Sequence, residues 1–377
     1  MLITGAEVPA GFLRLYREIG ISPAHRVAQP HPSDPGAAVE ERLLTAPDDD
    51  LRGYGFSPYA VLPETARLVA AYGLAARPPD AGTVRKVSSK SWSSALLDTL
   101  GLPGGGVIVG SVGELLTAVA QFGDHPVLLK DPYGVGGRGI LEVSSPRALR
   151  TVCRVLSAQV ARGLRVELLV QPRWDRAADF SAQFRIDSGG RLHWHGVVVI
   201  ENAGFSHVGT RPPDPEFQRR LDEAGYASII ADVGAALADA GYHGPVDVDS
   251  MLLRDGTLVP LLEINPRMSV GLIGILAGAR LTGPATTARL AVRPVRSADT
   301  RGTFDAVLAL MREHRVLFTP GGTGLLPLAA NTLRTSRGRL HCIVVSGNAE
   351  EDRRLGTALD LITRLVSEQA AGASRAS

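Results

Sequence analysis

Residues 126–143, PVLLKDPYGVGGRGILEV, contain an apolar run, a lysine, a glycine-rich turn and a second apolar run. We interpret this stretch as a strand, a loop and a second strand. Because glycine lacks a Cβ, its backbone N–H groups can approach an anion closely, and Lys130 would present its ammonium to the same anion. The stretch therefore has the chemistry of a phosphate-binding loop, although an ordinary glycine-rich hairpin turn explains it equally well on its own. The loop glycines are Gly134, Gly136, Gly137 and Gly139.

Three other nucleotide-binding motifs are excluded by the surrounding sequence. The spacing G-x-G-x-x-G indicates a dinucleotide site only when it opens a helix, whereas residues 140–143, ILEV, are typical of a strand. A protein-kinase glycine loop would require H-R-D-L, D-F-G and A-P-E elements, which the chain lacks. A Walker A loop is also absent, because no glycine is followed directly by lysine.

The composition indicates a cytoplasmic protein with small-molecule partners. The length of 377 residues is sufficient for about two or three domains. A net charge of +2, without basic runs interleaved with aromatics, argues against nucleic-acid and membrane partners. There is neither an apolar run of about 18 residues nor a signal-peptide pattern at the start. Cys153 and Cys342 fit no metal-ligand spacing and no disulfide framework.

Lysine is rare in this chain: of 40 basic residues only Lys86, Lys90 and Lys130 are lysines. A coding bias toward arginine is the simplest cause. The lysines that remain are then candidates for positions where a compact ammonium on a flexible stem is needed. Lys130 already lies at the proposed phosphate loop.

The rest of the first half predicts an α/β unit that follows an irregular N-terminal region. Residues 1–85 are rich in Pro, Asp, Ala and Gly and carry no nucleotide-binding glycine pattern. Residues 86–103, KVSSKSWSSALLDTLGLP, predict a loop holding Lys90 and then a helix capped by Ser91 or Ser93. Further along the chain, residues 215–240 predict one long helix.

A second decisive stretch is residues 241–269, GYHGPVDVDSMLLRDGTLVPLLEINPRMS, which predicts two strands joined by an Asp-Gly turn. This turn can bring Asp249 and Glu263 opposite each other. Two carboxylates that close repel each other unless a cation lies between them. The pair is therefore a candidate metal site, and a surface hairpin with acidic residues is the alternative.

Two residues that follow Glu263 extend this candidate site. Asn265 shares its strand face with Glu263, since side chains alternate with period two. Mg²⁺ prefers few carboxylates together with waters and phosphate oxygens, so these ligands suit a metal that carries ATP. Arg267 lies two residues further and could neutralise a transferring phosphate or an oxyanion.

Taken together, residues 86–278 resemble the ATP-grasp superfamily of carboxylate ligases in the order of their motifs. The resemblance implies an α/β (α+β) fold in which a nucleotide is held between a small lid subdomain and a larger, mostly antiparallel core. It also implies a short N-terminal domain at 1–85, the lid at 86–174, the core with its metal site at 175–285 and the rest of the core with the acceptor side at 286–377.

The resemblance also assigns roles to single residues. It implies that the cofactors are ATP and Mg²⁺, with Mn²⁺ as a substitute for Mg²⁺. Arg267 and Lys130 would be catalytic, and Asp249, Glu263 and Asn265 would bind the metal. The family often has Glu where this chain has Gln171 in the hinge that pairs with adenine. The residues expected to bind ATP are Lys90, Lys130, Gly134, Gly136, Gly137, Gly139, Val170, Gln171 and Asp179.

The chemistry implied is an ADP-forming ligation through an acyl phosphate, forming a peptide or amide bond between amino acids or short peptides. Residues 55–74 resemble the pre-ATP-grasp region of actinobacterial specialised-metabolism ligases, including pheganomycin-type peptide ligases and butirosin-type ligases that load glutamate on a carrier protein. A carrier-protein thiol as acceptor and a non-catalytic nucleotide-binding regulator are the alternatives. A homodimer is a further expectation.

Candidate substrate residues follow the expected hinge, in RLHWHGVVVIENAGFSHVGTRP at 191–212. His193 and His195 alternate onto one strand face, and His207 and Arg211 follow. A guanidinium suits a carboxylate substrate because it can bind both oxygens at once. A strand histidine is more often solvated or structural. We therefore expect Arg211, with His195 and His207 beside it, to contact the substrate.

Overall fold

The computed structural model describes residues 1–377 except 32, 35, 48, 76, 124, 133–138, 165, 205, 298–299 and 377. The side chains of residues 49 and 370–376 are also outside the description. Gly134, Gly136 and Gly137 therefore lie outside the described residues, whereas Gly139 is described with a φ of 82°. The role of the glycine loop in covering phosphates stays a prediction.

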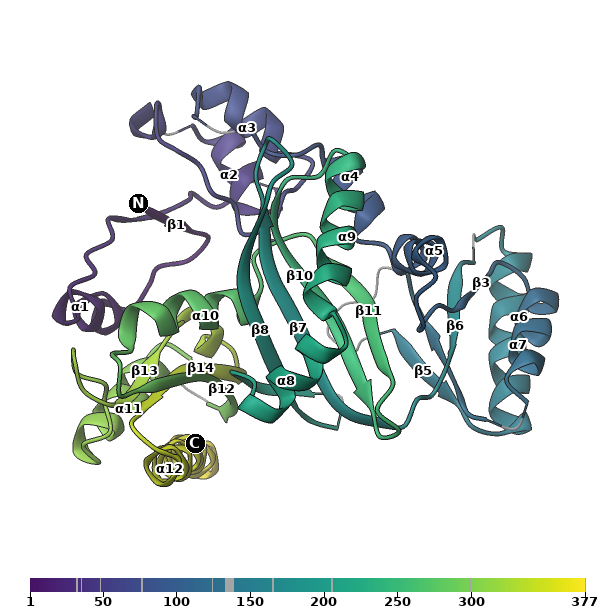
Figure 1. Cartoon of the computed structure of the whole chain (residues 1–377). Coiled ribbons are helices and arrows are strands. Elements are labelled where there is room, and N and C mark those ends of the chain that lie inside the picture. The colour runs from purple at the N-terminus through teal and green to yellow at the C-terminus, as the bar shows by residue number, and fades with distance from the viewer. Residues whose placement is uncertain are drawn as a thin grey trace.

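The smaller sheet is antiparallel and carries the predicted strand, loop and strand. β4 (Val127–Lys130) pairs with β5 (Ile140–Val143), so that Lys130 lies opposite Ile140, on either side of the glycine segment. Two helices, α6 (Val112–Gln121) and α7 (Pro146–Ala161), pack against this sheet and close a small apolar core (Figure 1). The sheet order is β3 (Val107–Val109), β6 (Leu168–Pro172), β4 (Val127–Lys130) and β5 (Ile140–Val143).

The larger sheet is also antiparallel, which confirms the fold predicted for the core. Its strands run in the order β11-β10-β7-β8-β9-β12-β14-β13, so the C-terminal strands extend the sheet that holds the candidate metal site. Their bounds are β7 Arg176–Ile186, β8 Leu192–Ala203, β9 Ser206–Arg211, β10 Gly244–Leu253, β11 Leu258–Asn265, β12 Thr287–Arg296, β13 Gly324–Pro327 and β14 Arg337–Ser346.

Helices cover both faces of the larger sheet. α8 (Pro215–Glu223) and α9 (Tyr226–Asp239) pack on the apolar face of β7 and β10, where Phe180 and Val248 are fully buried. α10 (Val270–Leu281) packs on the opposite face, against β8 and β12. The prediction of one helix over 215–240 is wrong. The helix breaks at Gly225, whose φ of 65° disfavours any residue with a Cβ.

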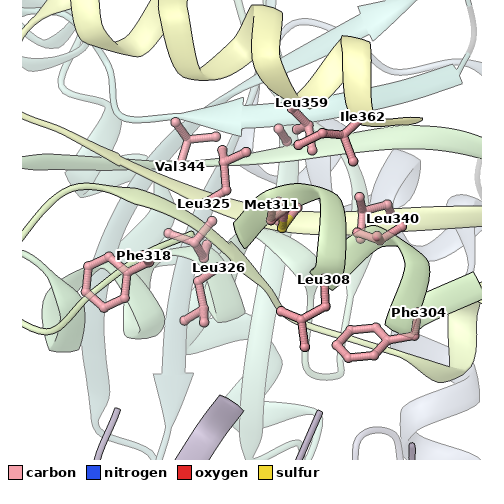
Figure 2. Close-up of a cluster of buried hydrophobic side chains, with 14 of the residues drawn as sticks. Phe304, Leu308, Met311, Phe318, Leu325, Leu326, Leu340, Val344, Leu359 and Ile362 are labelled. Atoms are coloured by element: carbon pink, nitrogen blue, oxygen red, sulfur yellow. The ribbon is translucent and has the colours of Figure 1, made fainter. Parts of the chain in front are cut away.

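The C-terminal part packs around an apolar layer between β12, β14 and the helices α11 (Thr303–Glu313) and α12 (Ala349–Ala376) (Figure 2). Phe304, Met311 and Leu359 are at most 1% exposed. The N-terminal helix α1 (Ala10–Glu18) joins this layer, because Phe12 meets Phe304 edge to face with ring centroids 5.6 Å apart. The first helix of the chain is therefore fixed to its last third.

The remaining N-terminal elements lie in two places. The short parallel pair β1 (Leu2–Thr4) and β2 (His25–Val27) and the helices α2 (Val39–Thr45) and α3 (Thr65–Tyr72) form a small cluster beside the tips of β7 and β8 (Figure 1). The helix α4 (Ala81–Val87) precedes α5 (Lys90–Leu100), which packs on β11. Single turns of 3₁₀ helix occur at Asp49–Leu51 and Asn331–Leu333.

The start of α5 differs from the sequence prediction. Ser89 is the N-cap, because its side chain accepts a hydrogen bond from the backbone N–H of Trp92. The predicted caps Ser91 and Ser93 therefore lie inside the helix, and Lys90 is its first residue rather than a loop residue. In the described part of the chain no helix has both the length and the apolar character to span a membrane.

Candidate active site

The centre of the candidate site is a row of acidic residues on β10 and β11. Asp249 lies directly opposite Glu263, as the turn predicted, and Asp247 lies opposite Asn265. The turn between the strands places Gly256 at a φ of 88°. Because side chains alternate along a strand, Asp247 and Asp249 lie on the same face. The hairpin thus gathers three carboxylates and one amide over two successive residue pairs.

Hydrogen bonds connect this row to Arg267. The Asn265 side-chain amide donates to a carboxylate oxygen of Asp249 at 3.1 Å. Arg267 donates through Nη2 to the Asn265 side-chain oxygen at 3.1 Å and through Nη1 to the Met268 carbonyl at 3.2 Å. Among the described residues, its guanidinium forms no ion pair with a carboxylate within 4 Å. The arginine is therefore positioned by neutral acceptors and retains its charge for a bound anion.

The two predicted lysines reach the acidic row from different elements. Lys90 is nearly buried at the start of α5, and its Nζ lies 3.3 Å from Glu263 Oε2. Lys130, at the end of β4, is close enough for the charges of Glu263, Lys90, Asp249 and Asp179 to act on its ammonium. Burial lowers the pKa of Lys130 to about 8. Lys90 of α5 and Lys130 of the smaller sheet thus both face carboxylates of the larger sheet.

Asp247 is a member of this cluster that the sequence analysis missed. Burial raises its pKa to about 6, and burial together with the charges of Asp247 and Glu263 raises the pKa of Asp249 well above its usual range. Close, buried carboxylates favour protonation because water no longer screens their repulsion. The repeat V-D-V-D at 246–249 could have identified it, since period-two alternation puts both acids on one face.

A buried glutamine holds Asp247 in place. Gln183 Nε2 donates to Asp247 Oδ1 and to Ser181 Oγ, both at 2.8 Å. Ser269 Oγ donates to Gln183 Oε1 at 2.7 Å and also caps α10. The side-chain polar groups on this face are therefore connected from β7 through β10 to the first turn of α10.

The donor set fits a metal that arrives with phosphate. No group of three or more His, Cys, Asp and Glu side chains in the described residues is arranged to hold a metal ion by itself. Asp249, Glu263 and Asn265 instead offer two carboxylates and one amide oxygen. Mg²⁺ is commonly bound by one or two carboxylates together with waters and substrate phosphates. The chemistry of these residues therefore suits Mg²⁺ bound jointly with a nucleotide.

The predicted hinge lies on β6, the strand of the smaller sheet that leads directly into β7 of the larger sheet. Val170 is fully buried, and Gln171 donates through Nε2 to the Gly104 carbonyl at 2.8 Å. The buried Oε1 of Gln171 has no hydrogen-bond partner within the described part of the chain. An unpaired buried acceptor is unusual in a folded protein. Asp179, which shares the face of Gln183, is bound by Arg176 and Asn202 at 2.9 Å each.

The structure separates the three predicted substrate residues. His195 and Arg211 line one cavity of about 280 Å³ beneath α10, whereas His207 does not line it. Arg211 lies 3.8 Å from Glu201 and 3.6 Å from Asp214, so two carboxylates already offset its charge. Burial, with the charges of His341 and Arg339, lowers the pKa of His207.

The expected alternation of the strand histidines is interrupted. A register shift opposite Gln183 and Phe184 breaks the pairing of β7 with β8. His193 accordingly meets Asp187 at 2.8 Å near the strand turn, whereas His195 lines the cavity beneath α10. Burial lowers the pKa of His195, and the charges of His193 and Arg185 lower it further.

Comparisons with known proteins agree with this architecture. No family model matches the chain. A curated relative, the [butirosin acyl-carrier protein]–L-glutamate ligase of Niallia circulans, is 24% identical over 237 residues, which is 61% of this chain. The chain spans about half the length of that relative, since the match covers 54% of it.

Two solved structures share the fold over almost the whole chain. A biotin carboxylase–βγ-ATP complex from Campylobacter jejuni has a TM-score of 0.62 and 14% identity, covering 95% of this chain and 90% of that one. An L-amino acid ligase from Bacillus licheniformis has a TM-score of 0.55 and 15% identity, covering 95% and 96%. With the two antiparallel sheets and the lysine and carboxylate order described above, these likenesses show that the chain has the ATP-grasp fold.

Proposed function

We propose that this protein is an ATP-dependent, ADP-forming carboxylate–amine ligase that joins amino acids or short peptides through an acyl phosphate. One observation carries the proposal. Lys90, Lys130 and Arg267 come from three separate elements and gather around the facing pair Asp249 and Glu263. Such an arrangement suits polyanionic phosphate and a divalent cation, and it has no evident role in packing.

Each group has a role that its chemistry supports. Lys90 and Lys130 neutralise phosphate oxygens, and Asp249, Glu263 and Asn265 hold Mg²⁺ or, as its substitute, Mn²⁺. When bound, the metal neutralises phosphate charge. Buried positions strengthen these interactions because the local dielectric is low. Val170 and Gln171 on β6 would pair with the adenine, and Asp179, whose charge acts on Lys130, would lie toward the phosphates together with the glycine loop. The loop glycines in this proposal are Gly134, Gly136, Gly137 and Gly139.

The reaction has two steps. First, a carboxylate oxygen of the acid substrate attacks the γ-phosphorus of ATP, the bond from phosphorus to the bridging oxygen breaks, and ADP leaves. Second, the amine nitrogen attacks the acyl carbon, a C–N bond forms, phosphate leaves with the electrons of the C–O bond, and the amine loses a proton. Arg267 stabilises the oxyanion of the tetrahedral intermediate.

The substrate class and the acceptor are supported by different relatives. The fold shared with an L-amino acid ligase favours a free amino acid or short peptide as acceptor. The butirosin relative, a ligase for an acyl-carrier protein, favours a second candidate in which a carrier-protein thiol is acylated. A regulator with a degenerate site is disfavoured because every lysine, metal ligand and arginine expected of a ligase is present.

Product analysis by mass spectrometry separates these candidates. The protein is incubated with ATP, Mg²⁺ and pooled amino acids and short peptides, with and without an acyl-carrier protein bearing its thiol. We expect amide products in the first mixture. An increase in the mass of the carrier alone would select the second candidate, and the absence of both products and of ATP consumption would contradict the ligase proposal.

A further inference from the structure

A cavity of about 420 Å³ lies between the N-terminal region and the ends of β7, β10 and β11. Residues 56–61 and 77–79 line one side, and residues 185, 187–188, 242–245 and 266–267 line the other. Figure 1 shows this end of the large sheet beside the N-terminal helices. A volume of this size accommodates a small-molecule substrate. None of the predicted substrate residues lines this cavity.

This cavity shares a wall with the candidate active site. Arg267, Pro266 and Ala60 line it and also line a smaller cavity of about 190 Å³ that contains Glu263 and Asn265. The shared segment is fixed, because the backbone N–H of Met268 donates to the Tyr59 carbonyl at 2.9 Å. Arg267 therefore contacts both the metal-ligand side and the larger cavity.

The larger cavity has an excess of positive charge. Its charged lining consists of Arg77, Arg185 and Arg267 against the single acid Asp187. Asp187 is already paired with His193 at 2.8 Å. In the part of the chain that the structure describes, neither Arg77 nor Arg185 forms an ion pair within 4 Å. Unpaired guanidinium groups in a cavity are well suited to bind carboxylate or phosphate oxygens.

Arg185 and Arg267 lie at the same end of the larger sheet. Gln183, Asp247 and Asn265 form one row across β7, β10 and β11. Arg185 lies two residues beyond Gln183, and Arg267 lies two residues beyond Asn265 at the same end of the sheet. Arg267 lies just past the end of β11, where its backbone N–H donates to the Asn265 carbonyl at 2.9 Å. Both side chains line the same cavity, so they can contact one small molecule from two sides.

We propose that this cavity binds an acid substrate carrying a second anionic group, with the reacting carboxylate at Arg267 and the second anion at Arg185 and Arg77. The second anion is a carboxylate or a phosphate, since a guanidinium binds both. The inference rests on the proposed function and narrows it from amino acids in general to those with an acidic side chain. The apolar walls, including Tyr59, Pro78 and Pro245, hold the carbon chain between the charged ends.

Direct binding tests this inference independently of turnover. Isothermal titration calorimetry compares L-glutamate with L-glutamine, and O-phospho-L-serine with L-serine, on the full chain. We expect at least one anionic ligand to bind about tenfold or more tightly than its neutral analogue. Arg185→Gln should remove that preference, and Arg185→Lys should restore part of it. Arg219→Gln, which changes an exposed arginine on α8, should leave it unchanged.

The outcomes distinguish this inference from the proposed function. Preference for glutamate indicates a second carboxylate, and preference for phosphoserine indicates a phosphate. The inference would be overturned if both ligands of each pair bound equally or not at all. It would also be overturned if the preference for the anionic ligand survived in a folded Arg185→Gln variant. An Arg185-dependent preference without ADP release would contradict the ligase proposal alone. ADP release that depends only on neutral amino acids would contradict this inference alone.

Discussion

The protein has two buried layers of opposite character. The layer around Phe304, Met311 and Leu359 is apolar, so its burial stabilises the fold directly. The layer where Lys90 of α5 and Lys130 of β4 face the carboxylates of β10 and β11 instead takes charged groups partly or fully out of water. Burying charge costs free energy unless the charges are well paired. The comparison indicates that the first layer maintains the fold and that the second is retained for chemistry.

Replacing Lys130 should have the largest effect, because it should abolish most activity without destabilising the fold. Lys130→Ala should lower kcat/KM for ATP-dependent ligation about 10³-fold, because a buried cation facing the phosphates is lost. The melting temperature should stay the same or rise, since a desolvated ammonium is removed. Kinetics and thermal melting check this prediction, with exposed Lys86→Ala as the control. Full turnover in folded Lys130→Ala would reject the site.

The apolar layer should show the reverse behaviour. Leu359→Ala should lower the free energy of unfolding by about 3 kcal/mol, because it leaves a cavity among fully buried side chains. The KM for ATP should not change in the folded fraction. Urea unfolding and kinetics provide the measurements, with the exposed Leu116→Ala of α6 as the matched control. A selective loss of ATP affinity would show that the layers are not separable.

Replacing one of the two carboxylates proposed to bind the metal should have a smaller and more specific effect on nucleotide binding. Glu263→Gln keeps the size of the side chain but removes one anionic ligand, so the Mg²⁺ concentration for half-maximal nucleotide binding should rise about tenfold. A Mg²⁺ titration of nucleotide binding measures this. Glu223→Gln on α8, in an exposed ion pair, serves as control. An unaltered Mg²⁺ requirement would remove Glu263 from the metal site.

Arg211 should have the smallest effect on substrate use. Because Glu201 and Asp214 already offset its charge, Arg211→Gln should change the KM for the acid substrate less than about threefold. Steady-state kinetics with saturating ATP checks this expectation. An increase of tenfold or more would support the cavity beneath α10 as the substrate site.

The features that could be predicted from the sequence are those set by local patterns of strand alternation and turn residues. The alternation and Asp-Gly turn at 241–269 predicted the pairing of Asp249 with Glu263, because strand register follows from turn position and period. The same local reasoning failed at Gly225, where one glycine ends α8 before α9 begins. It also chose the wrong cap for α5, since several serines precede the helix and only backbone geometry selects Ser89.

Tertiary contacts explain what could not be predicted. The cavity of Arg77 and Arg185 forms because residues from the N-terminal region meet the ends of distant strands, and no periodicity encodes that contact. The charge around Arg211 likewise depends on Glu201 and Asp214 across a strand and a loop. The division into domains at 85, 174 and 285 remains a proposal. Two contacts cross these boundaries, because α1 packs on α11 and α5 packs on β11.

The central claim is that the charged layer transfers the γ-phosphate of ATP to a carboxylate. Nucleotide products formed with ATP, Mg²⁺ and pooled amino acids and short peptides can be resolved by chromatography. We predict substrate-dependent release of ADP and phosphate, absent in Lys130→Ala and retained in Lys86→Ala. Release of AMP and pyrophosphate would contradict an acyl-phosphate mechanism and with it this account of the site.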